Sequence, residues 1–512
     1  MSTIRPNRSY GSASGGSGQS TTEISGPLSG FGELEIISPT PTSQVSFVYG
    51  INPLLATSQT YGAGSTVSSS GGEVIVSSGT ASNSYARVIS KKVAKYRPGQ
   101  ATLARWTARY SAGVSNNRQM SGIYNIEGGY RFGYNGQQFG ILYTESATIE
   151  VQTLTITTKS SAATNVTVTL DGGPGVIVPV TNGANTSITA YEISLANYSQ
   201  VAGGWDAIAI QNVVYFTRRI AGPAGASSFN PGVSGAVGSF AILTTGVAPS
   251  DVFIAQQDWN RDTCNGAGLS RVNIDHTKGN IYQVQFQYLG YGNAFFSVIN
   301  GETGRPVLCH VIENANTRTS TNLRNPNLYL SWESVNNGST TPVSLRGASG
   351  GTFVEGAIKY LGAQFSVTGT KSIGASVETP ILTLRASNVL QGRKSMAQLQ
   401  IDRISVACDG AKPVDIKVYK NGNLVGAQFQ KANLIASASD VDSAASSFSI
   451  GSGVQIFGFS VSKTGNSTES LTDLDLFLQS GDTVTITAFT ANPGGGGGGS
   501  DVSASIVWIE DI

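Results

Sequence analysis

The chain has 512 residues, a formal net charge of +1 and only 12% charged residues, roughly half the usual share. No long basic or acidic run occurs, which excludes the charged surface of a nucleic-acid-binding protein, so we predict no nucleic-acid partner. The length exceeds one ordinary hydrophobic core, and we expect about three domains. Gly, at 63 copies, and neutral polar residues replace the missing charge, which suits dense assembly. A secreted β-protein, or a chain with disordered linkers, is the alternative.

The first residues carry Arg5 and Arg8 without an apolar stretch after them, and no apolar run of membrane-spanning length follows. We therefore expect a soluble protein with no secretory leader and no membrane insertion. The three cysteines, Cys264, Cys309 and Cys408, are an odd number without Cys-x-x-Cys spacing. We interpret them as buried free thiols and expect neither a disulfide framework nor a zinc site.

Residues 9–29 and 65–84 are rich in Gly, Ser and Thr without periodicity. This composition predicts an extended N-terminal arm over residues 1–99, which would become ordered against neighbouring subunits. Within it, the apolar run at 45–49 could add an edge strand.

From about residue 100 the sequence has the pattern of a β-protein. Apolar and polar residues alternate over 148–157 and 165–170, which predicts half-buried strands. Residues 187–200 carry apolar side chains at helical spacing, and 207–217 reads as one strand. We therefore expect a small α+β insert at about 160–248.

The next strands are bounded by turn sequences. Segments 281–290, 294–299 and 306–312 predict a meander around the turn at Asn300-Gly301. Asn421-Gly422 tolerates positive φ and predicts a hairpin between 414–419 and 424–429.

Two further strands are expected at 482–490 and 502–509, on either side of a run of six glycines. The predicted fold is all-β, with tandem β-sandwich or jelly-roll domains. The domains are an arm at 1–99, a sandwich at 100–360 that carries the insert, and a jelly-roll-like C-terminal sandwich at 361–512.

Few residues suggest chemistry. His276 and His310 are the only histidines, so an imidazole metal site would need both, and isolated histidines in β-proteins are more often structural. Ser349 lies in Gly347-Ala-Ser-Gly-Gly351, which differs from a serine-protease motif by Ala348 in place of Asp. In a chain this rich in Gly and Ser, chance explains the match.

Asp473 and Asp475 would share one face of a strand, and Asp440 and Asp442 have the same spacing within a loop. Either pair could serve as paired acids or as a cation site, but a solvated face is the commoner role. No phosphate loop or dinucleotide motif occurs. We predict no catalytic residue, cofactor or metal, and hence no enzyme.

Aromatic residues cluster in one short segment and could stack on sugars, although such residues more often fill a core. They are Tyr282, Tyr288, Tyr291, Phe295 and Phe296.

Two stretches resemble a family of virion structural proteins. The first runs Arg105-Trp-Thr-Ala-Arg-Tyr-Ser-Ala-Gly and continues through Gly129-Tyr-Arg-Phe-Gly-Tyr-Asn-Gly. The second is Asp275-His-Thr-Lys-Gly-Asn-Ile-Tyr-Gln-Val-Gln-Phe-Gln-Tyr-Leu-Gly. The family comprises minor capsid or appendage proteins of large double-stranded DNA viruses, of the algal giant-virus type, with relatives in tailed phages. The resemblance covers roughly 100–360, and departs from the family where Asp-Pro is usual and Asp275-His276 stands here.

The resemblance implies a structural component of a virus particle, made in the host cytoplasm and located in the virion as a minor capsid, vertex, fibre or tail protein. Its partners would be copies of itself and other virion proteins. The alternative is a receptor-binding adhesin whose C-terminal sandwich recognises host-surface glycan; an enzyme is a third class.

Overall fold

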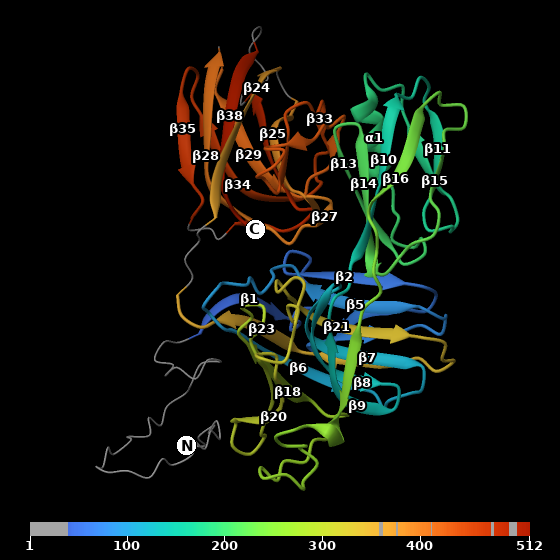
Figure 1. Cartoon of the computed structure of the whole chain (residues 1–512). Helices are drawn as coiled ribbons and strands as arrows, with labels where there is room; N and C mark the ends of the chain where they lie inside the picture. Colours follow the sequence, from blue (N-terminus) through green and yellow to red (C-terminus); the bar gives the residue numbers. More distant parts are fainter. Residues whose placement is uncertain (1–38, 358–361, 375–376, 411, 473–475, 491–498) are drawn as a thin grey trace. The chain divides into compact units, whose positions relative to one another are not determined.

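The computed structural model describes residues 39–357, 362–374, 377–410, 412–472, 476–490 and 499–512 (Figure 1). The described chain is almost entirely β, with one α-helix, which confirms the predicted fold class. It divides into two compact units. Unit 1 comprises Met1–Ala147 and Pro249–Ile358, and unit 2 comprises Thr148–Ala248 and Lys359–Ile512.

Unit 1 is a sandwich of two antiparallel sheets. In the larger sheet β6 pairs with β18, β22 and β23, and the strands run in the order β20-β19-β18-β6-β22-β4-β3, with β1 beside β23. Its strands are β1 (Thr40–Ser46), β3 (Thr66–Ser70), β4 (Glu73–Ser77), β6 (Thr102–Tyr110), β18 (Asn280–Phe286), β19 (Ala294–Ile299), β20 (Pro306–Ile312), β22 (Ser344–Gly347) and β23 (Ser349–Val354).

The second sheet of unit 1 has the order β17-β9-β8-β7-β21-β5-β2. Its strands are β2 (Ala56–Tyr61), β5 (Tyr85–Ser90), β7 (Asn117–Asn125), β8 (Gly128–Asn135), β9 (Gln138–Thr144), β17 (Asp251–Ala255) and β21 (Tyr329–Asn336), with a 3-10 turn η1 at Gln256–Asp258.

Aromatic side chains from both sheets fill the core of unit 1. Phe132 of β8 lies 5.0 Å from Tyr282 of β18 and 5.6 Å from Phe296 of β19, measured between ring centroids. Trp106 and Trp332 are also fully buried. Each large ring buries a large apolar area, so these contacts between the sheets stabilise the sandwich.

The predicted N-terminal arm differs from the structure. Residues 1–38 lie outside the described residues, but β1 to β5 occupy much of 40–90 and belong to both sheets of unit 1. The run at 45–49, expected to add an edge strand, falls partly within β1, which pairs with β23 alone. Strands such as β3, Thr-Val-Ser-Ser-Ser, lack a regular apolar alternation, and their pairing partners supply the order that their composition does not.

Unit 2 contains the insert, which forms a small sandwich of its own. One sheet has the order β13-β14-β10-β16 and the other β12-β11-β15. The strands are β10 (Ile149–Thr158), β11 (Thr164–Thr169), β12 (Val176–Val180), β13 (Trp205–Ile210), β14 (Val213–Ala221), β15 (Ser228–Asn230) and β16 (Val237–Thr244), and the helix α1 is Thr186–Ser194.

The rest of unit 2 is a larger sandwich formed by the C-terminal residues. Its sheets have the orders β24-β38-β28-β35, with β36 beside β28, and β31-β32-β25-β37-β29-β34. The strands of these sheets are β24 (Ala363–Ile373), β25 (Thr379–Ala386), β28 (Gln398–Gly410), β29 (Val414–Lys420), β31 (Gln430–Lys431), β32 (Ser439–Asp442), β34 (Val454–Val461), β35 (Asn466–Ser470), β36 (Phe477–Leu478), β37 (Thr483–Thr490) and β38 (Ser500–Asp511). Two short two-stranded sheets accompany them. One pairs β26 (Val389–Leu390) with β27 (Arg393–Lys394), and the other pairs β30 (Leu424–Val425) with β33 (Ser447–Phe448).

The helix is shorter than the predicted 187–200. Asn185 caps its first turn by accepting a hydrogen bond from the Ile188 backbone N–H at 3.1 Å. At the other end the Asn197 side chain accepts from the Ser199 N–H at 2.9 Å, a local turn that competes with further helix. The predicted strand at 207–217 is two strands, β13 and β14, because Gln211 turns the chain with a positive φ of 53°.

The predicted Asn421-Gly422 hairpin is wrong. Asn421 does have a positive φ of 58°, but β29 pairs with β34 and β37, and β30 pairs with β33. Leu424 and Phe429 are instead buried in a hydrophobic cluster with Tyr191 of α1. Packing against the insert therefore outweighs the local turn preference.

The same cluster explains why the insert belongs to unit 2 rather than to the predicted 100–360 domain. It combines insert residues such as Trp205 and Tyr198 with Tyr419 and Phe448 of the C-terminal sandwich. The Tyr191 hydroxyl also donates to the Leu424 carbonyl at 3.1 Å. The insert and the C-terminal segment thus share one buried core.

Candidate functional site

Both histidines are buried and bonded within unit 1. His276 stacks on Phe139, and its Nε2 lies 2.9 Å from the side-chain oxygen of Gln256. His310 accepts from the Asn260 backbone N–H through Nδ1 at 3.1 Å. Burial lowers the pKa of each histidine from 6.5 to about 4. Each imidazole is therefore neutral at pH 7 and packs as part of the core.

Ser349 begins β23, where its backbone N–H donates to the Thr107 hydroxyl at 3.0 Å. Among the described residues neither histidine is hydrogen-bonded to Ser349, since His276 contacts Gln256 and Tyr282, and His310 contacts Asn260. The structure does not bring together a nucleophile and a base at this serine. That the protein is not an enzyme stays a prediction.

The structure places only one of the two predicted aspartate pairs. Asp473 and Asp475 lie outside the described residues. Asp440 and Asp442 are in β32, not in a loop, and both are buried rather than solvated. Asp442 accepts from the backbone N–H groups of Gln428 and Ala445, at 2.6 and 3.1 Å. Asp442 is thus a structural acceptor.

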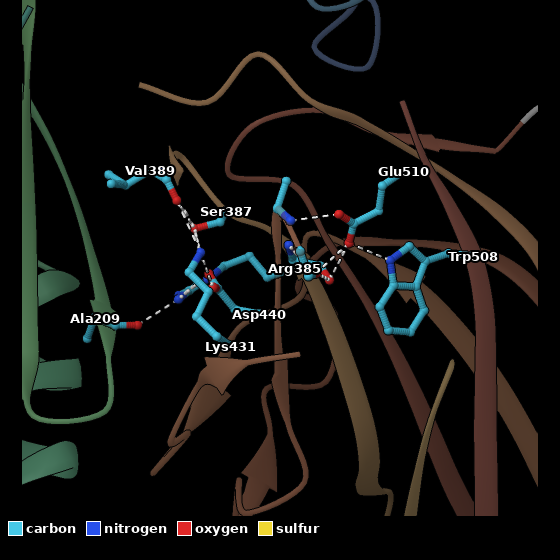
Figure 2. Close-up of polar contacts among 11 residues, drawn as sticks. Ala209, Arg385, Ser387, Val389, Lys431, Asp440, Trp508 and Glu510 are labelled. Carbon is cyan, nitrogen blue, oxygen red and sulfur yellow. Dashed lines mark hydrogen bonds and ion pairs between the residues drawn. The ribbon is translucent and has the colours of Figure 1, made fainter. Parts of the chain in front are cut away.

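Asp440 lies at the centre of a buried charge network (Figure 2). Nε of Arg385 donates to its Oδ2 at 3.0 Å, and Nζ of Lys431 lies 2.9 Å from its Oδ1. The side chains of Arg385 and Asp440 are 6% and 0% exposed. Two cations already neutralise this single carboxylate, and a metal ion bound to it would meet both positive charges, which argues against the cation-site alternative.

The remaining donors of this network reach neighbouring segments. Arg385 donates through Nη2 to the Ala209 carbonyl at 2.6 Å, and its guanidinium carbon lies 3.8 Å from the centroid of the Phe429 ring. Lys431 donates to the Ser387 hydroxyl at 2.7 Å and to the Val389 carbonyl at 3.1 Å. The network therefore links β25, β31 and β32 to the insert.

Glu510, near the end of β38, has a second buried network (Figure 2). Its carboxylate accepts from the hydroxyls of Ser437 and Ser439 at 2.6 and 2.7 Å. It also accepts from the Ala438 backbone N–H at 2.6 Å and the Trp508 indole N–H at 2.9 Å. Three of these donors meet Oε1 and one meets Oε2, so the carboxylate fixes residues 437–439 against β38.

Unit 1 has a comparable network around Glu333 of β21. Arg131 and Arg87 approach its carboxylate to 3.1 and 3.5 Å, and Arg118 to 3.8 Å. Burial alone would raise the pKa of Glu333, but the three arginines outweigh it and hold the pKa below 4.5. The Arg131 guanidinium also lies 3.7 Å from the Tyr124 ring centroid. Sequence reasoning missed all three networks, because the partners come from distant strands.

The aromatic segment contributes mainly to the core. Tyr282 and Phe296 are fully buried, Tyr288 and Phe295 are half-buried, and Tyr291 is exposed. In residues 361–512 the single Tyr and the single Trp, Tyr419 and Trp508, are both buried. Neither ring is therefore accessible for stacking on a sugar.

The described residues contain neither a metal-binding cluster nor a membrane-spanning helix. Across the ranges given above, no group of three or more His, Cys, Asp or Glu side chains is placed to hold a metal ion. The helix in the described part of the chain is neither long nor apolar enough to cross a membrane.

No known protein family matches the sequence, and no curated protein matches it either. Among solved structures, the chain is similar to the Emp46p carbohydrate recognition domain in its metal-free form, at 8% identity and a TM-score of 0.23 over 62% of this chain and 97% of that one. Peanut lectin with a 9mer peptide is 10% identical, with a TM-score of 0.21 over 62% of this chain and 100% of the lectin chain. A triple jelly-roll protein of an archaeal virus turret assembly is 8% identical, with a TM-score of 0.16 over 92% of this chain and 97% of that one. Values this low assign no function, and the resemblance to virion proteins stays a prediction.

Proposed function

We propose that this protein is a structural component of a virus particle, which assembles with copies of itself and with other virion proteins through the edges of its sheets. The observation that carries the proposal is that long edge strands are exposed and carry no charge. Two of them, β16 in the insert and β34 in the C-terminal sandwich, are in unit 2.

Each of these strands has eight residues and pairs on one side only within the described chain. Strand β16 pairs with β10, and β34 pairs with β29. Their sequences, Val-Gly-Ser-Phe-Ala-Ile-Leu-Thr and Val-Gln-Ile-Phe-Gly-Phe-Ser-Val, contain no charged residue and no proline. Ile242 and Val454 are 59% and 45% exposed.

A free strand edge presents unpaired backbone N–H and C=O groups, and monomeric proteins usually protect it with lysine, proline or a bulge. Strands β16 and β34 each carry one bulge, at Leu243 and at Ile456, but neither strand has a charge or a proline, and this favours pairing with a strand of another chain. Further uncharged strands, β1, β2 and β3, lie at sheet edges in unit 1. The low overall charge supports the same role, since neutral surfaces repel one another little.

The glycan-binding alternative and the enzyme have less support. The C-terminal sandwich exposes neither its Tyr nor its Trp, and Ser349, His276 and His310 are bonded elsewhere, as described above. Glycan-array binding and activity assays would test these two roles, and no contact in the described residues favours either.

The test is sedimentation of the full chain over a range of concentrations, compared with the variant Ile242→Lys/Val454→Lys. A lysine on each edge strand should weaken association by at least about tenfold, because pairing would bury its charge. Leu434→Lys is the matched control, because Leu434 is 85% exposed but lies outside the strands. If the wild-type chain stays monomeric at every concentration, or if both variants behave alike, the proposed edges are not used.

Presence in the particle is a separate question. Antibodies against the chain should label intact virus particles, and the chain should co-sediment with them through a density gradient. Labelling confined to soluble fractions would contradict the virion assignment.

A further inference from the structure

Two of the three cysteines lie against each other in the core of unit 1. Cys264 is in the segment between η1 and β18, and Cys309 is in β20. Both side chains are 0% exposed, and their Sγ atoms are 3.4 Å apart. The third, Cys408, lies in unit 2, where its thiol donates to the Lys412 carbonyl at 3.6 Å.

The backbone holds Cys309 firmly in place. The ladder between β19 and β20 shifts register at this residue, since Phe296 pairs with His310 and Ser297 with Leu308. Cys309 is therefore the extra residue of a β-bulge. Its carbonyl accepts from the backbone N–H groups of Arg261 and Asp262, both at 3.0 Å.

Cys264 is fixed by an equally local set of bonds. Its backbone has a positive φ of 50°, and its N–H donates to the Asp262 carboxylate at 2.8 Å. Its carbonyl accepts from the Ile274 N–H at 3.0 Å. Because neither backbone depends on the thiols for its position, the contact between them is set by the surrounding fold.

Two buried thiols can also pack simply as small apolar groups. Cys309 donates its S–H to the Val307 carbonyl at 3.3 Å, which satisfies that thiol without any reaction. Packing alone, however, does not require the two sulfur atoms to be in direct contact, and the two cysteines are 45 positions apart in the sequence.

We infer that Cys264 and Cys309 are a disulfide-forming pair, which a small disulfide oxidant such as oxidised glutathione converts to a cystine that ties the 259–276 segment to β20. The thiolate of one cysteine attacks the oxidant, whose S–S bond breaks and releases one thiol. The second cysteine then attacks the mixed disulfide at the protein sulfur and releases the second thiol. The two cysteines are oxidised, the oxidant is reduced to two thiols, and the two protons lost by the cysteines go to these thiols.

The reaction should be slow in the folded chain. Burial, together with the neighbouring Cys264 thiol, raises the pKa of the Cys309 thiol well above its ordinary value, so little thiolate is present. The bond therefore forms while the chain folds or when the 259–276 segment opens. Once formed, the same burial shields it from reductants.

The experiment uses the full chain with Cys408→Ser, which leaves only the pair. The protein is equilibrated in a series of reduced and oxidised glutathione mixtures, once folded and once in guanidinium chloride. Free thiols are then alkylated, and peptide mass spectrometry measures the fraction of Cys264–Cys309 cross-link, which lacks two hydrogen atoms. At equal mixture composition, the equilibrium constant for cross-linking should be at least about tenfold larger in the folded chain, because the fold holds the two sulfurs together.

Single variants provide the matched controls. Cys264→Ser and Cys309→Ser should each give no intramolecular cross-link, and the remaining thiol should be alkylated or carry one glutathione. If the folded chain is cross-linked no more readily than the unfolded chain, or if both cysteines are fully alkylated after prolonged equilibration with the oxidant, the inference is wrong and the pair is only packing. A fall in the thermal midpoint of the oxidised protein on adding reductant provides an independent readout that needs no substitution.

Discussion

The guanidinium group of Arg385 donates a 2.6 Å hydrogen bond to the backbone carbonyl of Ala209, a residue 176 positions away in the sequence. The same side chain is paired with Asp440 of β32 in the C-terminal sandwich. One arginine therefore connects the insert to the strands that follow it, beside a core that both segments share. Unit 2 is held together by a charge as well as by apolar packing.

Replacing Arg385 should destabilise unit 2 strongly. Arg385→Met would leave the Asp440 carboxylate buried with Lys431 alone and the Ala209 carbonyl without this donor. We expect a loss of about 3–5 kcal/mol in the free energy of unfolding, measured by urea titration with circular dichroism. Arg403→Met is the control, since Arg403 pairs with Asp402 and is half exposed, and it should cost less than about 1 kcal/mol. Equal losses in the two variants would contradict the role of the network.

Glu510 offers a test of the second network. Glu510→Gln keeps the shape of the side chain but turns an N–H group toward donors that need an acceptor. The expected loss is about 3 kcal/mol, because the bonds to a buried carboxylate are charge-assisted. Asp409→Asn, at an exposed position on β28, should change stability little, by about 0.5 kcal/mol or less. A Glu510→Gln protein as stable as the wild type would show that the four donors find other partners.

The buried histidines should make unit 1 sensitive to mild acid. Each has a pKa of about 4 in the folded chain and about 6.5 when unfolded, so below pH 6.5 the unfolded chain binds more protons. Stability is thus fully present above pH 6.5 and is lost as the pH falls toward 4. The loss at pH 5 should be roughly 2 kcal/mol for His276 and about 1 kcal/mol for His310, which is less completely desolvated and therefore more strongly screened by solvent.

Urea unfolding at pH 7 and pH 5 measures this effect above the range in which most carboxylates titrate. The double variant His276→Gln/His310→Gln should be less stable at pH 7 but nearly independent of pH over this interval. If the free energy of unfolding of that variant falls between pH 7 and pH 5 as much as in the wild type, other groups cause the acid sensitivity.

Subunit association should depend little on salt. The proposed edges, β16 and β34, carry no charge, so screening has little to act on. We expect the dissociation constant from sedimentation to change by less than about threefold between low salt and about 0.5 M sodium chloride. Dissociation at moderate salt would indicate that ion pairs, rather than strand edges, carry the contact.

Local pattern was a good guide where partners are close in sequence. Strands β18, β19 and β20 were predicted by their alternation and by the turn at Asn300, and they pair in that order. Prediction failed where the partner is distant: β1 pairs with β23, whose residues lie about 300 positions further along the chain. The hairpin at Asn421 failed for the same reason, since Leu424 and Phe429 pack on the insert.

The candidate site was predictable only in part. The sequence singled out Asp440 and Asp442 as a candidate pair of acids but placed them in a loop, whereas they lie in β32. That Arg385 and Lys431 would neutralise Asp440 could not be read from the sequence, because burial and pairing are set by the folded sheet. The nearness of Cys264 and Cys309 depends likewise on a bulge in β20.

The order of the strands also constrains how the protein is made on the ribosome. Unit 1 needs β1 and β23, so it cannot be completed until the whole insert has been synthesised. Strand β38, which follows all the other described strands in the sequence, lies inside its sheet between β24 and β28 rather than at an edge. The C-terminal sandwich therefore cannot close until β38 has been synthesised, and a nascent chain that stops before β23 would leave both units unfinished. A stop codon placed before Ser500, which removes β38, should therefore yield a protein that cannot close this sheet.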